Sequence, residues 1–544
     1  MLRTLSRSPL CWLLLFAFVL RAVTICWGIP FDEFTTFYHA DEVKSWGSAV
    51  DFPANYLTSE NYLYGTAVQY IVGILLTPLR LAMDSPDPHQ HQRYVVAAVL
   101  CFRLFNVLMG TAAVGLTFVL GQRLFDRTTG LIAAGLLAVS TSQVMNSALC
   151  TLDVPMSLLL VASLLLTDRA FSSGRPMHFA LAGLVAGLLC GTKLTGFFFV
   201  AVPCAMLLIE WSEARSDQSV KRESIGWLFR NLTVIFLPVA ALTFAISTPH
   251  VVLSMDEYLE FMQRQKLQWY DRPSPTIAET LSAWFHSASD TIGPLGTLCL
   301  LVSIGVAPFV KEHRRIYWPV VLFVVGYFLF WKSYLPARFV AFTGPFLCVL
   351  AASGIIVISR QFRGAQKPAF VVLLTLLLIV PAWQVGAETL ARLNDPRTEA
   401  ARFVRNEFPA GTTIGVTTDS SEYTWRHHQW RYPQIDWTRY PEVPFLDGPE
   451  VLVASSIEVE LMRDALQSEK LLAGYRWDER HRSDWYQLTP PSPEVFRFYE
   501  DLIHERSYRL ISTFDVPSNP ETGGLYPAVL IYRRSDAGGV IEMP

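Results

Sequence analysis

Residues 94–120 read YVVAAVLCFRLFNVLMGTAAVGLTFVL, an apolar run that contains a single charged residue, Arg103. About 20 apolar helical residues cross the roughly 30 Å of hydrocarbon in a bilayer, so this run is long enough to span a membrane. Ten further runs surround it, at residues 10–29, 130–150, 154–167, 177–192, 194–210, 231–248, 291–310, 316–331, 338–358 and 368–386. The sequence therefore predicts a mainly α-helical, polytopic membrane protein with about eleven spans.

Composition divides the chain into two parts. Of its 544 residues, 51% are hydrophobic and 17% are charged, whereas soluble proteins carry about 25% charged residues. Residues 1–386 contain 27 basic and 22 acidic side chains, while residues 387–544 contain 17 basic and 25 acidic ones and no cysteine. We expect a transmembrane body over 1–386 and a soluble domain over 387–544, whose acidic balance argues against binding to nucleic acid.

The C-terminal part alternates helical and strand-like patterns, which favours a small α/β domain. Apolar residues recur at helical spacing over residues 398–408 and 458–466. Short β-like runs stand at residues 412–417, 451–454, 508–514 and 528–532, and the last two are expected to pair.

Basic residues fall in every second connection between the spans, and the positive-inside rule assigns these connections to the cytoplasm. With an uncleaved first span, the N-terminus is then cytoplasmic and the C-terminal domain extracytoplasmic, with external loops at residues 30–93 and 249–290. Residues 62–83 are also apolar, but a span there would reverse every later loop. We therefore expect this segment to lie along the outer interface. The sequence therefore predicts an integral membrane protein that lies in the bacterial inner membrane.

The first external loop contains His39, Ala40, Asp41 and Glu42 in sequence. A carboxylate at the mouth of a helix bundle is partly desolvated, which suits a general base. The alternative is a solvated acidic turn that caps a helix beginning at residue 43. The tetrad is a weak signal by itself.

Three further charges stand at outer ends of predicted spans. Asp153 lies at the tip of a tight hairpin, where it is either functional or a helix cap followed by a proline in the first turn. Lys193 and Arg338 occupy similar outer positions, and one such cation is explained by contact with lipid headgroups. Two cations beside acidic residues instead indicate a site that holds an anionic group near a base.

A metal site is the least supported of these possibilities. His250 and Glu257 could join Asp41 or Asp153 as ligands of Mg or Mn, because carboxylate and imidazole suit these ions. No ligand spacing supports this set, and a structural histidine is the simpler interpretation. The chain also lacks a Walker loop, a nucleophile elbow and an H-E-x-x-H motif. Energy for any reaction would therefore arrive with a membrane-borne substrate.

The order of these short motifs resembles the polyprenyl-phosphate-dependent glycosyltransferases of the C-type membrane fold. Within this fold, the chain resembles the family-39-like group, which includes the protein O-mannosyltransferases and the lipid A aminoarabinose transferases. The resemblance covers most of residues 1–386. The matching positions are His39 to Glu42, the stretch from Tyr62 to Gly73, Arg103, Asp153, the stretch from Gly187 to Gly196, Thr248 to His250, and Arg338 with Phe339 and Pro345. Ala40 and Phe339 replace a proline and a tyrosine of the family pattern, and neither change alters a charge.

The resemblance implies transfer of a sugar, with inversion, from a polyprenyl-phosphate donor to a protein, lipid or glycan acceptor at the outer face. Asp41 would be the general base, and Lys193 and Arg338 would stabilise the lipid-phosphate leaving group. Asp153 and Glu42 would orient sugar hydroxyls or Lys193. The remaining substrate-binding candidates are His39, Tyr62 and His250. No cofactor is implied beyond a divalent cation such as Mg or Mn.

Two other functions fit a polytopic protein with a soluble domain. One is a transporter or flippase of lipid-linked saccharides, although transporters usually show inverted repeats and charges near the midplane. The other is a non-catalytic membrane assembly subunit whose soluble domain recruits partners. Bond cleavage in a polyprenyl-phosphate sugar distinguishes an enzyme from both.

Overall fold

The computed structural model describes residues 8–29, 40–58, 65–83, 88–216, 222–269, 276–307, 314–330, 340–361, 366–417, 439–456, 459, 463, 493–515 and 528–535. It divides into two compact units. The first contains residues 1–25, 41–84 and 97–387, and the second contains residues 26–40, 85–96 and 388–544. The expected helix over residues 458–466 falls largely outside the described residues.

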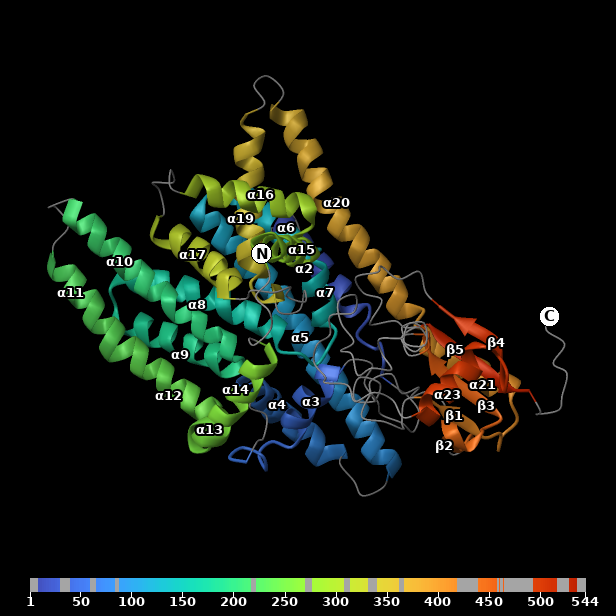
Figure 1. Cartoon of the computed structure of the whole chain (residues 1–544). Coiled ribbons are helices and arrows are strands. Elements are labelled where there is room, and N and C mark those ends of the chain that lie inside the picture. The colour runs from blue at the N-terminus through green and yellow to red at the C-terminus, as the bar shows by residue number, and fades with distance from the viewer. Residues whose placement is uncertain are drawn as a thin grey trace. The chain divides into compact units, whose positions relative to one another are not determined.

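Helices are the regular elements in the described residues of the first unit, and turns connect them (Figure 1). Three of its helices extend into the stretches of the second unit, namely α3 and α5 at their beginnings and α20 at its end. Its helices are α2 (Pro9–Ala22), α3 (Ala40–Val50), α4 (Ala67–Met83), α5 (Pro88–Leu124), α6 (Arg127–Ala138), α7 (Thr141–Ser147), α8 (Asp153–Ser173), α9 (Pro176–Thr192), the 3-10 helix η1 (Leu194–Val200), α10 (Ala201–Ser216), α11 (Arg222–Asn231), the π-helical turn η2 (Leu232–Phe236), α12 (Leu237–Ser247), α13 (Pro249–Leu253), α14 (Met255–Trp269), α15 (Ile277–Ile292), α16 (Pro294–Val306), α17 (Arg314–Phe330), α19 (Gly344–Ser359) and α20 (Gln366–Leu393).

The apolar runs form the expected helices, and a helix coincides with each of the eleven. Among the described residues, five helices are long and apolar enough to cross a membrane, or up to seven if each bent pair forms one span. The bent pairs are α6 with α7, at 56°, and α15 with α16, at 114°. Four shorter apolar helices of the described residues add to these, namely α2, α4, α9 and α19. The fold class is thus confirmed, while the count of eleven stays a prediction.

Helix α19 forms the centre of the first unit's core. Residues 344–355 along it are all buried, because its sequence is apolar or small on every face. It packs against α16 and α6, and at Gly354 an added Cβ would lie 1.9 Å from the Cys299 carbonyl oxygen. Glycine at this position therefore lets the α16 backbone approach closely.

Helix α4 covers most of the apolar segment at residues 62–83. The helix contacts α9 and α12, and its Val68, Val72 and Leu76 are buried, whereas Ile74 and Leu81 are 58% and 81% exposed. An apolar exposed face suits lipid whether the helix crosses the membrane or lies along it. The interfacial placement of this segment therefore stays a prediction.

The second unit contains a five-stranded mixed sheet with helices on both faces (Figure 1). The elements are α21 (Pro396–Glu407), β1 (Ile414–Val416), β2 (Glu442–Pro444), η5 (Phe445–Asp447), β3 (Val451–Ser455), α23 (Pro493–Ile503), β4 (Tyr508–Phe514) and β5 (Val529–Arg534). The strand order is β2-β1-β3-β5-β4, with β1 parallel to β2 and β3, and with β5 antiparallel to β3 and β4. The expected α/β domain and its final strand pair are confirmed.

Strand β3 is covered on both faces of the sheet, by α21 on one face and by α23 on the other. Val451 and Val453 pack in the core that contains α21, while Leu452 and Ala454 pack in the core that contains α23. Successive side chains of a strand point to opposite faces, so a strand covered on both sides is apolar throughout. All five residues of β3 are accordingly buried.

Candidate active site

Asp153 and Lys193 form a buried ion pair at one end of the α8–α9 hairpin. The Lys193 Nζ lies 2.8 Å from the Asp153 Oδ1, and each side chain is 9% exposed. Asp153 is the first residue of α8, whereas Lys193 directly follows α9. A helix favours a negative charge at its N-terminus and a positive charge at its C-terminus, so both helices stabilise the pair. The fold thus brings together two of the residues that the sequence singled out.

Three glycines of α9 allow the close packing that fixes the end of this helix. Gly183, Gly187 and Gly191 recur every fourth residue and face η2 and α12. An added Cβ would lie 2.5 Å from the Phe236 carbonyl oxygen at Gly183 and 2.5 Å from the Ala240 carbonyl oxygen at Gly187. At this separation the two backbones leave no room for a side chain. Close packing against η2 and α12 therefore fixes the position of α9, and Lys193 directly follows the end of this helix.

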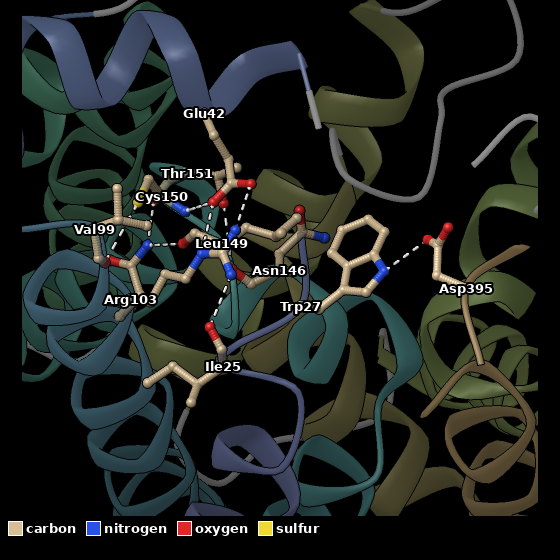
Figure 2. A network of polar contacts seen from close by, with 11 residues as sticks. Ile25, Trp27, Glu42, Val99, Arg103, Asn146, Leu149, Cys150, Thr151 and Asp395 are labelled. Carbon is tan, nitrogen blue, oxygen red and sulfur yellow. Dashed lines mark hydrogen bonds and ion pairs between the residues drawn. The ribbon is translucent and has the colours of Figure 1, made fainter. Parts of the chain in front are cut away.

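Glu42 and Arg103 form the second buried ion pair of the first unit (Figure 2). The Arg103 Nε donates to the Glu42 Oε1 at 2.9 Å, and the Arg103 Nη2 donates to the Glu42 Oε2 at 2.9 Å. Both side chains are 0% exposed. The Cys150 backbone N–H also donates to the Glu42 Oε1 at 2.7 Å, and the Arg103 Nη1 donates to the Ile25 carbonyl at 2.7 Å. This bidentate pair fixes the first turn of α3.

These contacts change the expectation for Glu42. Orienting sugar hydroxyls or Lys193 requires a carboxylate that reaches a substrate cavity, but both Glu42 oxygens bind Arg103 and the side chain has no exposed surface. A buried carboxylate is stable only when it is paired and hydrogen-bonded, and the cation inside α5 supplies that partner. We therefore treat Glu42 as a positioning residue. The sequence singled out Arg103 as the one charged residue in a long apolar run but assigned it no role.

A short turn connects the two ion pairs along the chain. Asn106 on α5 donates to the carbonyls of Leu149 and Thr151, at 2.6 and 2.7 Å, while Glu42 accepts the N–H of Cys150 between them. Figure 2 shows Glu42 and Arg103 beside the turn formed by Leu149, Cys150 and Thr151. The chain then continues directly into α8. Buried hydrogen bonds thus hold residues 149–151 to α3 and α5, two residues before Asp153 in the chain.

Arg21 is a further buried cation that sequence analysis did not assign. Its guanidinium donates to the Leu137 and Ala138 carbonyls at the end of α6, at 2.8 and 3.1 Å, and to the Ala17 carbonyl at 3.1 Å. The last carbonyls of a helix lack intrahelical partners, so a break inside an apolar bundle needs a donor. Arg21 supplies that donor at the bend between α6 and α7.

The other predicted site residues are placed only in part. Asp41 lies in α3 next to Glu42, but its side chain is outside the described residues, as are His39, Tyr62 and Arg338. His250 is described and is 1% exposed in α13, whereas Glu257 is exposed on α14. In the described part of the chain, no three His, Cys, Asp or Glu residues could together hold a metal ion. The Mg or Mn site stays a prediction, because the side chain of Asp41, one of its candidate ligands, lies outside the described residues.

Comparisons with known proteins agree with this architecture. Residues 67–254 match the model of the dolichyl-phosphate-mannose-protein mannosyltransferase family. The fold is similar to that of the archaeal oligosaccharyltransferase AglB from Archaeoglobus fulgidus, in complex with an inhibitory peptide and a dolichol-phosphate. This match has 13% identity and a TM-score of 0.50, and covers 96% of this chain and 88% of that chain.

Two further solved structures are similar at 13% identity. ArnT from Cupriavidus metallidurans, bound to undecaprenyl phosphate, is covered over 100% of its chain and 98% of this one, with a TM-score of 0.48. The arabinosyltransferase EmbB from Mycobacterium smegmatis is covered over 41% of its chain and 73% of this one, with a TM-score of 0.39. No curated protein sequence matches the chain. The expected resemblance to C-type membrane glycosyltransferases of the family-39 type is confirmed by the family match and the shared fold.

Proposed function

We propose that this protein is an inverting membrane glycosyltransferase that takes a sugar from a polyprenyl-phosphate donor. The observation that supports this most is the buried Asp153–Lys193 pair. Asp153 directly follows the 149–151 turn in the chain, and a hydrogen bond from Cys150 to Glu42 connects that turn to the helix bearing Asp41. The chain thereby joins a cation suited to a phosphate with a carboxylate suited to a base. The family match over residues 67–254 and the dolichol-phosphate in the AglB structure support a lipid-phosphate donor.

The proposed reaction is one in-line displacement at the anomeric carbon. The Asp41 carboxylate accepts the proton of the acceptor hydroxyl or amine as that atom attacks the anomeric carbon. The bond from this carbon to the phosphate oxygen breaks, and its electron pair leaves on the lipid phosphate. Lys193 and Arg338 stabilise the charge that develops there. Since an ammonium carries three N–H donors, Lys193 can bind Asp153 and a phosphate oxygen together.

Asp153 is proposed to orient Lys193 rather than to exchange a proton with substrate. A lysine side chain has several rotatable bonds, and the 2.8 Å contact with Asp153 restricts them. His39, Tyr62 and His250 remain proposed contacts of the donor or acceptor. The acceptor is a protein, a lipid or a glycan, and a peptide is the first to test because AglB was solved with one.

The test is a transfer assay with the purified full-length protein and a radiolabelled polyprenyl-phosphate sugar. Asp41→Asn should abolish transfer, whereas the matched control Asp51→Asn, at an exposed position after the same helix, should leave it within about twofold. Wild-type transfer by Asp41→Asn would remove Asp41 from the base role. Movement of the donor across liposomes without bond cleavage would favour the flippase instead. Repeating the assay with EDTA tests the expectation of Mg or Mn.

The proposed location is the bacterial inner membrane, with the N-terminus in the cytoplasm and the C-terminal domain outside. Single cysteines introduced into the second unit should then react with an impermeant maleimide in intact cells. Labelling only after lysis would reverse the orientation and would place the Asp153–Lys193 end of the bundle in the cytoplasm.

A further inference from the structure

A second cluster of buried charges lies in the second unit, around Trp27. The Trp27 indole Nε1 donates to the Asp395 Oδ2 at 2.9 Å, as Figure 2 shows. The guanidinium carbons of Arg392 and Arg397 lie 4.4 and 5.7 Å from the Trp27 ring centroid. Trp27 is 6% exposed, and the other three residues are exposed by 4% or less. We call these four residues the Trp27 clamp.

Asp395 is the hydrogen-bonding centre of the Trp27 clamp. Its Oδ1 accepts the Arg397 backbone N–H at 3.0 Å and the Arg397 Nε at 2.8 Å, and its Oδ2 accepts the Arg397 Nη2 at 2.6 Å in addition to Trp27. A tryptophan suits this position because it offers both an N–H donor to the carboxylate and a π face to the two guanidinium groups. Replacement by phenylalanine would keep the face and remove only the donor.

The Trp27 clamp joins two distant parts of the chain. Asp395 is the N-cap of α21, the helix with which the C-terminal domain begins, and Trp27 follows the first apolar helix at a distance of 368 residues in sequence. Residues 26–40 accordingly belong to the same compact unit as residues 388–544. The C-terminal domain therefore holds the chain where it leaves the first helix.

The same segment is also held at its other end. Glu42 is bound by Arg103 and by the Cys150 N–H inside the first unit. Only residues 28–41 separate Trp27 from Glu42, and the candidate base Asp41 is among them. In sequence, Asp41 therefore lies between two buried charge clusters, one in each compact unit.

We propose that the Trp27 clamp is a positioning device, through which the C-terminal domain sets the segment leading to Asp41 for transfer. In this role, Asp395, Arg392 and Arg397 act on Trp27, and Trp27 acts on the chain that follows it. The effect of the Trp27 clamp on transfer rests on the proposed function. Its effect on the chain around Trp27 is structural and can be measured without a transfer assay.

The structural consequence is tested by amide hydrogen exchange of the full-length protein in detergent. Loss of a hydrogen bond to a buried charged group should raise exchange of amides in residues 23–29 by about tenfold in Trp27→Phe. Asp395→Ala should raise it further. The control is Trp383→Phe, the same change at a tryptophan that is 77% exposed on α20. Unchanged exchange in Trp27→Phe and Asp395→Ala would overturn the Trp27 clamp.

The catalytic consequence is tested with the transfer assay. We expect kcat to fall about tenfold in Trp27→Phe while KM for the polyprenyl-phosphate donor stays within about twofold, because misplacement of a base affects the reacting geometry more than donor binding. Trp383→Phe should match the wild type. If exchange rises in Trp27→Phe but kcat does not change, the positioning role is wrong. If the wild-type protein transfers no sugar at all, the proposed function fails, and the exchange data still decide whether the clamp exists.

Discussion

Replacement of Arg103 by methionine removes one partner of the buried pair beside Asp41. Methionine retains the apolar stem of the side chain but lacks the guanidinium that donates twice to Glu42 at 2.9 Å. The Glu42 carboxylate then stays at 0% exposure with the Cys150 N–H but without its cation. Breaking a buried ion pair from one side costs about 3–5 kcal/mol, so we expect the free energy of unfolding to fall by about this amount.

The assay is a denaturant titration of the full-length protein in mixed micelles, followed by tryptophan fluorescence. Glu42→Gln and the double variant Glu42→Gln/Arg103→Met complete a mutant cycle, and the double variant should lose about 1–3 kcal/mol less than the sum of the single variants. The matched control is Arg123→Met in the same helix. Its partner Asp168 retains Arg315 at 2.8 Å, and the Arg123 side chain is 45% exposed, so its loss should cost under about 1 kcal/mol.

Two results would refute the reasoning on Arg103. An Arg103→Met variant within about 1 kcal/mol of the wild type would mean that the carboxylate is not held as a buried anion. Additive losses in the mutant cycle would mean that Glu42 and Arg103 do not interact in the folded protein. In either case the proposed positioning of Asp41 through its neighbour would lose its physical basis.

The remaining predictions concern the other buried features. Asp153→Asn and Lys193→Met should each lower kcat at least about 100-fold, and equal loss in the double variant, measured by the transfer assay, would show that they act as one unit. Arg21→Met should lower the free energy of unfolding by about 3 kcal/mol, because helix-end carbonyls lose a charged donor; a wild-type denaturation midpoint would contradict this. Gly187→Ala should destabilise by about 1–3 kcal/mol, whereas Gly226→Ala, with no atoms within 4 Å of an added Cβ, should not; equal midpoints would disprove the close α9–α12 contact.

Much of the fold was predictable because its signals are local. Hydropathy over a window of residues predicted the helical runs, and apolar spacing predicted α21, β1, β3, β4 and β5. The missed elements include β2, with only three residues, and α23, whose apolar face contains Phe498 and Tyr499. Helix α14 and most of α15 were also missed, because residues 249–290 were predicted only as an external loop. A strand of three residues such as β2 carries too few residues for a periodic signal, so tertiary contacts decide it.

The sequence by itself determined which residues are exceptional. A charge such as Arg103, Asp153 or Lys193 within apolar chain is costly at any position in a bilayer, and this cost follows from composition alone. Only the tertiary structure decided the partners: Asp153 with Lys193, 40 residues apart, and Glu42 with Arg103, 61 residues apart. Pairing depends on which charged side chains the helix packing brings within about 3 Å of one another, and no local pattern encodes that distance.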